Sequence, residues 1–329
     1  MVTKLVKVEW VCNYYLSHCF FYTRVFMDPR RTRFRAYKLQ QSGSLMSYAT
    51  DANFTLIEAR IGPLSRPGLE QELDIFEKTR IDTLHITSWD NDHCKKSDLE
   101  EILIDFKPSK IEYPGYDPHC DHAQDCLDLI MKYKIPTRSR VKVDPPYIQS
   151  LDTSKELGYK DILYHPKWLS TSSNDNSTVK MFRTGSFNVL SLGDVEDENI
   201  AASLRRNRLL CQEVDVLVLA HHGAECALNT KKFFSHVKPK ITICTSNYQN
   251  MYEHPRPSVR DTLHKLEIPV YTTKTGDVII ESIHGHREYY ELTNFCANGE
   301  KISSSKILTS KKSHYLKMNL DARMNRYGR

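Results

Sequence analysis

The chain has 329 residues, of which 40% are hydrophobic and 26% charged, a balance typical of a globular protein with a sizeable core and not of a disordered or fibrous chain. The net charge of +5 is compatible with a polyanionic ligand but is too small to identify one. Nine cysteines without a Cys-x-x-Cys pair argue against a secreted disulfide scaffold or a zinc ribbon and favour a cytoplasmic protein.

The N-terminal apolar stretch, residues 10–26, is interrupted by polar side chains. A bilayer span needs about 20 mostly apolar residues, so we expect no membrane span here but two strands, at residues 5–11 and 19–26. Residues 28–53 begin with a basic run and continue as a polar segment containing Ser and Gly, which we interpret as an insertion or long loop.

The remaining chain alternates between strand and helix patterns. Strands are predicted at residues 54–61, 83–87, 162–164, 177–182, 187–192, 214–219, 240–245, 270–273 and 278–282. Helices are predicted at 67–78, 97–106, 198–210, 231–236 and 259–266, and a further strand–helix unit at 110–133. This order predicts an α/β (α+β) chain with two packed sheets and helices outside. The pattern ends near residue 294, and a basic tail or an appended helix is expected beyond it.

Four groups of metal-ligand side chains follow predicted strands. They are Asp90, Asp92 and His93; Asp194; His221 and His222; and His254. Taken singly, each group is more often a turn, a helix cap or a structural histidine. Because all four follow the same ends of strands, we expect them to meet around one or two divalent ions. A mixture of imidazole and carboxylate suits Zn2+ or Mn2+.

These groups and the segments between them follow the order of motifs in a known family. The segments are residues 87–93 (TSWDNDH), 174–177 (NDNS), 192–194 (LGD), 221–223 (HHG), 237–240 (VKPK) and 250–255 (NMYEHP). From about residue 84 to 280 the chain resembles the metallo-β-lactamase domain of the ComEC family of competence proteins. The resemblance implies an αββα sandwich, with the active site along one edge, that cleaves phosphodiesters with the help of metal ions.

Carried over residue by residue, the resemblance implies a ligand set for the metal. Its members are Asp90, Asp92, His93, Asp194 and one of His221 or His222, with His221 assigned to the metal. Asp194 would bridge two ions, and His254 would complete the shell or hold the phosphate. Asp92 is expected to orient the attacking water and accept its proton, and His222 or His254 to stabilise charge or protonate the leaving oxygen.

The chain departs from the family at two positions, because Ser88 replaces a histidine of the first motif and Ala224 replaces a serine. Serine is a poor zinc ligand, so one metal site is expected to be weakened or lost. Further possible ligands are Ser88, His165, Asn176 and Asn250, with His165 placed to substitute opposite Ser88. The membrane segments of the competence protein are not recognised, so we expect a stand-alone relative that does not take up DNA.

The expected organisation is a metallo-β-lactamase-fold domain over residues 1–285 and a basic extension over 286–329. The expected function is that of a metal-dependent hydrolase, a phosphodiesterase or nuclease acting on DNA or another nucleic acid. Two alternatives stay open: a phosphodiesterase of a small (cyclic) nucleotide, and a non-catalytic module in a multi-protein assembly. Protein partners cannot be named.

The basic stretches 30–38 and 301–329 are interpreted either as a nucleic-acid track or as a solvated surface. Residues 117–122 (DPHCDH), with Cys126, form a second metal cluster or merely a helix start.

Overall fold

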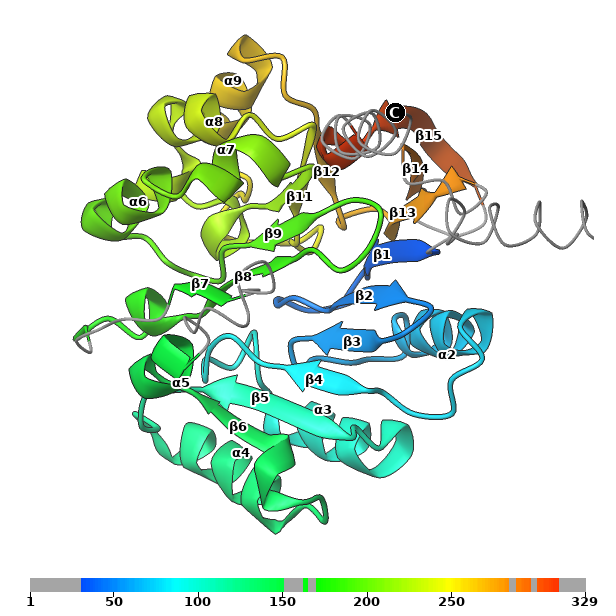
Figure 1. Cartoon of the computed structure of the whole chain (residues 1–329), viewed down its shortest axis with the longest axis vertical. Coiled ribbons are helices and arrows are strands. Elements are labelled where there is room, and N and C mark those ends of the chain that lie inside the picture. The colour runs from blue at the N-terminus through cyan, green and yellow to red at the C-terminus, as the bar shows by residue number, and fades with distance from the viewer. Residues whose placement is uncertain (1–30, 151–161, 165–169, 284–287, 297–300, 314–329) are drawn as a thin grey trace, which may run out of the picture.

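The computed structural model describes residues 31–150, 162–164, 170–283, 288–296 and 301–313, and within them the strands form two sheets (Figure 1). The nine-stranded sheet has the order β15-β14-β13-β1-β2-β3-β4-β5-β6 and the six-stranded sheet the order β12-β11-β10-β9-β8-β7. The larger sheet comprises β1 (Thr32–Ala36), β2 (Met46–Thr50), β3 (Phe54–Ile57), β4 (Thr83–His85), β5 (Lys110–Pro114), β6 (Arg140–Val143), β13 (Val278–Ser282), β14 (Tyr289–Phe295) and β15 (Ile302–Thr309). The smaller comprises β7 (Ile162–Tyr164), β8 (Val179–Phe182), β9 (Val189–Ser191), β10 (Val216–Val218), β11 (Ile241–Cys244) and β12 (Val270–Thr272).

Helices cover the outer face of each sheet (Figure 1). Those on the larger sheet are α2 (Arg66–Ile75), α3 (Lys96–Glu101) with a π-helical turn (Ile102–Phe106), and α4 (Asp121–Lys132). Those on the smaller are α6 (Glu198–Arg205), α7 (Arg208–Glu213), α8 (Lys231–Val237) and α9 (Pro257–Lys265), and a short α5 (Pro145–Ser150) follows β6. A third apolar cluster joins the inner faces of the two sheets, with Phe34 and Tyr48 from one and Phe187 and Val218 from the other. The layers are therefore ordered αββα.

The first two strands correct the interpretation of residues 28–53 as an insertion. β1 pairs with β13 and β2, so this segment lies in the middle of the larger sheet. Alternate side chains of a strand point to opposite faces: Phe34 enters the core between the sheets, whereas Arg33 and Arg35 face α2 and bind its buried Glu72. The expected strands 5–11 and 19–26 lie outside the described residues.

The same contacts correct the interpretation of residues 30–38 as an exposed basic stretch. Arg33 and Arg35 are only 9% and 8% exposed. Arg33 also binds Glu281, and Arg35 binds Asp277 at 2.6 Å. Because these guanidinium groups are buried and paired, they offer neither a solvated surface nor a track for a phosphate backbone.

The C-terminal region also differs from the expected tail or helix. β14 and β15 continue the larger sheet beyond residue 285: β14 pairs antiparallel with β13, and β15 pairs antiparallel with β14. The expected domain boundary therefore does not coincide with an edge of the sheet. The region after residue 313 lies outside the described part of the chain. Within that part, none of the helices has both the length and the apolar character required to span a membrane.

Candidate metal centre

Four of the predicted side chains meet at the edge of the sandwich. Asp92 and His93 follow β4 of the larger sheet, whereas Asp194 and His222 follow β9 and β10 of the smaller one. One ligand atom from each of the four lies within 4.8 Å of the others, the single such group among the residues that the structure describes. We call these four residues the His/Asp cluster.

His93 is oriented by a buried carboxylate. Its Nδ1 lies 3.2 Å from Oε1 of Glu58, which is 1% exposed and also accepts hydrogen bonds from the amide and the hydroxyl of Thr87. With Nδ1 engaged, Nε2 faces the cluster, 2.9 Å from Oδ2 of Asp194. Burial lowers the pKa of His93, but the Asp194 and Glu58 carboxylates outweigh it and raise this pKa well above its usual value.

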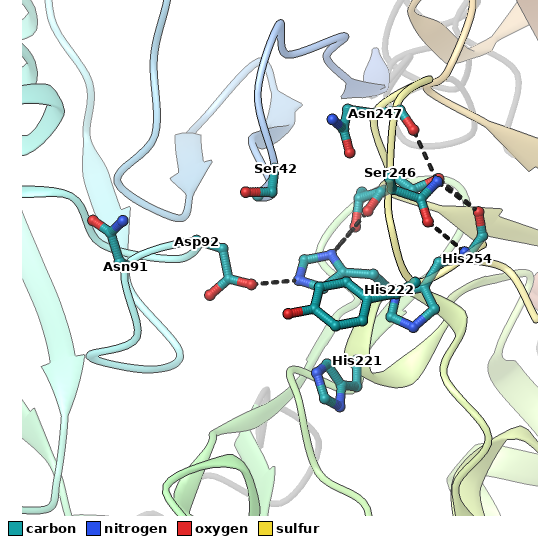
Figure 2. Close-up of a pocket in the computed structure, with 12 residues that line it drawn as sticks. Ser42, Asn91, Asp92, His221, His222, Ser246, Asn247 and His254 are labelled. Atoms are coloured by element: carbon teal, nitrogen blue, oxygen red, sulfur yellow. Dashed lines mark hydrogen bonds and ion pairs between the residues drawn. The ribbon is translucent and has the colours of Figure 1, made fainter.

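His222 enters the cluster from an unusual turn. His221 and His222 have φ angles of 43° and 52°, and Gly223 has 89°, all in the left-handed region that side chains rarely adopt. The turn points Nε2 of His222 at Oδ2 of Asp92, 3.2 Å away, while Nδ1 lies 2.8 Å from the carbonyl oxygen of Thr245 (Figure 2). Such backbone strain is often found at functional sites.

His221 and His254 lie beside the cluster but do not belong to it. Nδ1 of His221 is 2.8 Å from Oε1 of Glu196. The ring of His254 stacks on that of His222, with centroids 6.4 Å apart and an interplanar angle of 15°. Burial, aided by the neighbouring His222 and His221, lowers the pKa of His254 to about 4. The structure thus places His222 in the position that we assigned to His221.

The remaining candidate ligands have other partners. Ser88 donates to Oδ2 of Asp90 at 2.7 Å, and Oδ1 of Asp90 is 3.4 Å from Nε2 of His119, so Asp90 lies outside the cluster. Asn176 bonds both its amide atoms to the backbone of Ser170. Asn250 bonds to the backbone of the loop that carries His254. His165 lies outside the described residues.

The suspected second metal cluster at residues 117–122 is not assembled within the described part of the chain. Nε2 of His122 lies 2.7 Å from the carbonyl oxygen of Cys94, and His119 approaches Asp90 instead of the cysteines. The interpretation as a helix start applies, since α4 begins at Asp121.

Sequence reasoning missed Glu58 and Glu196, which bind Nδ1 of His93 and His221 at this site. Glu58 follows β3 directly, so the rule that singled out the other groups, polar side chains after a strand, applies to it as well. A lone Glu after a strand carries no metal motif of its own, however. Its role depends on the distance to His93, and only the folded chain provides that distance.

The His/Asp cluster fits a divalent ion. Two imidazoles and two carboxylates form a donor set suited to zinc or manganese. Nε2 of His93 is buried without a hydrogen-bond partner among the described residues, although Asp194 lies within ion-pair distance. A buried polar atom of this kind is costly unless a ligand satisfies it.

Two members of the cluster, Asp92 and His222, line a cleft of about 270 Å³ (Figure 2). Asn91 and Asp92 lie on one side of the cleft, and His221, His222 and His254 lie on the other (Figure 2). The complete lining is Ser42, Gly43, Asn91, Asp92, His221, His222, Thr245, Ser246, Asn247, Asn250, Tyr252 and His254. The cleft therefore joins the candidate metal centre to solvent.

Comparison with known proteins gives the following similarities. No family model matches the chain. It is 26% identical over 136 residues to ComE operon protein 3 of Bacillus subtilis (40% of this chain, 17% of that protein). It is 29% identical over 160 residues to Recombination protein 2 of Haemophilus influenzae (46% and 20%). The matched segments thus span a fifth or less of these relatives' own length.

Among solved structures, the metallo-β-lactamase fold protein YhfI from Bacillus subtilis is 10% identical with a TM-score of 0.48, covering 76% of this chain and 100% of that one. Igni18, a metallo hydrolase from Ignicoccus hospitalis, is 16% identical with a TM-score of 0.43, covering 76% and 98%.

The αββα layers, with a His/Asp cluster where strands of both sheets end, define the chain as a metallo-β-lactamase-fold protein. This confirms the fold predicted from the sequence. Within that class, the chain is similar to the ComEC-like competence proteins. The fold and the cluster together support a metal-dependent hydrolase.

Proposed function

We propose that the chain is a metal-dependent phosphodiesterase that acts on nucleic acid. The observation that carries the proposal is the meeting of Asp92, His93, Asp194 and His222 beside a cleft that Asp92 and His222 line. The similarity to a recombination protein supports nucleic acid as the substrate class. The net charge of +5 is compatible with a polyanion.

The His/Asp cluster would hold the metal. A bound divalent ion polarises phosphoryl oxygens and lowers the pKa of water. Asp92, which lines the cleft, would orient a water molecule and accept its proton. His221, whose Nδ1 is held by Glu196, and His254 line the same cleft and would hydrogen-bond a phosphate oxygen or the leaving oxygen.

The proposal is tested with bis(p-nitrophenyl) phosphate, a generic phosphodiester, in the presence of Mn2+ or Zn2+. We expect Asp92→Ala and Asp194→Ala to lower the rate by about a hundredfold or more while the circular dichroism spectrum is kept. The control His119→Ala alters a residue near Asp90 but outside the cluster, and it should keep the wild-type rate. Full activity of folded Asp194→Ala would refute the assignment.

A non-catalytic binding module is a second candidate, favoured by one observation. Ser88 and Asp90 form a hydrogen bond with each other, and Ser88 also lies 3.0 Å from the hydroxyl of Tyr116. The first half of the motif at residues 87–93 therefore contributes no side chain to the cluster. Elemental analysis together with the same assay separates the two functions. Stoichiometric metal with no hydrolysis of any phosphodiester would favour the module.

A further inference from the structure

The loop after β11 carries exposed aromatic side chains beside the cleft. Tyr248 is 76% and Tyr252 58% exposed, and Met251 between them is 84% exposed. Of these, Tyr252 lines the cleft itself. Neither the candidate metal centre nor the proposed chemistry uses this side chain, although leaving an aromatic ring in water forgoes the free energy of burying it.

Tyr252 is the outermost ring of a stack that leads to the His/Asp cluster. Its ring centroid lies 5.6 Å from that of His254 with an interplanar angle of 23°, and His254 stacks in turn on His222 at 6.4 Å and 15°. His254 and His222 are buried, at 7% and 9% exposure. Three nearly parallel rings therefore lead from solvent to a member of the cluster.

The inner part of the stack is held firmly. The carbonyl oxygen of His254 accepts hydrogen bonds from Ser246 and Asn250, and Asn250 also bonds to the carbonyl oxygen of Asn247. The backbone that positions His254 is thus fixed before any ligand arrives. A rigid ring that is backed on one side and open to solvent needs little ordering to receive a flat partner.

We propose that Tyr252, backed by His254, is a stacking platform for an unpaired nucleobase next to the phosphodiester in the cleft. A base within a duplex cannot occupy this platform, because its faces are covered by its neighbours. Stacking on an aromatic side chain tolerates any base and contributes about 1–3 kcal/mol. The inference rests on the proposed function for the identity of the ligand but not on catalysis.

The test is equilibrium binding in EDTA, where no hydrolysis occurs, followed by fluorescence anisotropy. Three probes of equal length are compared: a labelled single-stranded oligonucleotide, its abasic counterpart, and a duplex. We expect the wild-type protein to bind the base-containing single strand roughly tenfold more tightly than either other probe. Tyr252→Ala and Tyr252→Leu should remove this preference without changing the affinity for the abasic strand, whereas Tyr252→Phe should keep it.

The matched control is Tyr289→Ala, which removes a tyrosine that is 44% exposed on β14 and does not line the cleft. It should bind all three probes like the wild type. The platform is overturned if the abasic and base-containing strands bind equally, if the duplex binds as well as the single strand, or if Tyr252→Leu keeps the preference. Hydrolysis without any base preference would leave the proposed function intact, whereas base-dependent binding without hydrolysis would leave the platform and remove the catalytic proposal.

Discussion

Three histidines at the candidate metal centre each have Nδ1 next to an acceptor. The acceptors are Glu58 for His93, Glu196 for His221, and the backbone carbonyl of Thr245 for His222. An acceptor at Nδ1 fixes the proton there and leaves the lone pair of Nε2 for a ligand. The orientation of the rings is therefore built into the protein before any metal binds.

We expect Glu58→Gln to weaken metal binding by about 10- to 100-fold, because the amide holds His93 less firmly than the carboxylate does. The affinity is measured by competition with a metal-binding dye. Glu196→Gln is the matched control, since it makes the same change behind His221, which lies outside the cluster. An equal loss in both variants would show that His221 is also a ligand.

Adjacent residues of the same type mark the limit of sequence reasoning at this scale. Asp92, His93 and Asp194 were predicted and lie in the cluster, but the choice between His221 and His222 depends on two left-handed φ angles that the sequence does not reveal. Asn176 and Asn250 have atoms that could bind a metal, but these atoms form hydrogen bonds with backbone groups instead. The sequence predicted which types of residue form the site, but it did not predict which of the neighbouring side chains point into the cluster.

At the scale of structural elements, the turn after β10 is sterically constrained. A Cβ atom added at Gly223 would lie 2.8 Å from Cβ of Pro255, and the φ angle of 89° is strained for any side chain. The turn and the loop of His254 thus touch at a glycine. The close approach explains why both elements present their histidines to the same cleft.

Gly223→Ala is expected to destabilise the protein by about 1–3 kcal/mol, through backbone strain and the contact with Pro255. The free energy of unfolding is measured in urea. Gly62→Ala is the control, because an added Cβ meets nothing within 4 Å there, and it should be neutral or stabilise by up to about 1 kcal/mol. Equal stability of the two variants would contradict the assigned role of the turn.

The elements that sequence analysis misjudged share one cause. Seven of the eight side chains of β15 are exposed and the eighth is half-buried, so no alternation of buried apolar and exposed polar residues marks the strand in the sequence. The sequence of β1 is polar because two of its five residues are arginines. In the folded protein Glu72 of α2 neutralises them, so the strand can lie inside the protein. Strands and helices with an apolar face, such as β10 and α8, were located within a few residues.

At the scale of the whole molecule, the His/Asp cluster connects the two sheets. Asp92 and His93 come from the larger sheet and Asp194 and His222 from the smaller. An ion that is held by all four side chains can bind only when the two sheets are packed together, which means only to the folded protein. Metal loading should therefore stabilise the protein as a whole and not just the loops around the site.

At free metal a hundredfold above Kd, the stabilisation amounts to about 2.7 kcal/mol, which raises Tm by about 5 °C for a chain of this size. Differential scanning calorimetry with Mn2+ or Zn2+, and after chelation, measures the shift. Asp194→Asn should show no comparable rise. The same rise in that variant would place the stabilising ion elsewhere.

Asp215 introduces a pH dependence far from the cleft. It is fully buried and accepts hydrogen bonds from the amides of Asn188 and Lys311, at 2.9 and 2.7 Å. Burial raises the pKa of its carboxyl group to about 6. The folded state then holds the proton more tightly than the unfolded chain, so this contribution to stability is complete below about pH 4 and is lost as the pH rises through about 6.

The expected loss between about pH 4 and pH 7 is on the order of 2–3 kcal/mol. It is measured as the difference in unfolding free energy between the wild type and Asp215→Asn at each pH. The difference should move in favour of the variant as the pH rises. A difference that is independent of pH would mean that the carboxyl group is already ionised at the lower pH.

The separation of the cluster residues along the chain bears on how the protein is made. Asp92 and His222 are 130 residues apart, so a ribosome that has released the first has yet to synthesise much of the smaller sheet. A chain that ends before His222 accordingly lacks a complete set of donors. All four side chains can hold one ion only after both sheets have contributed their part of the site.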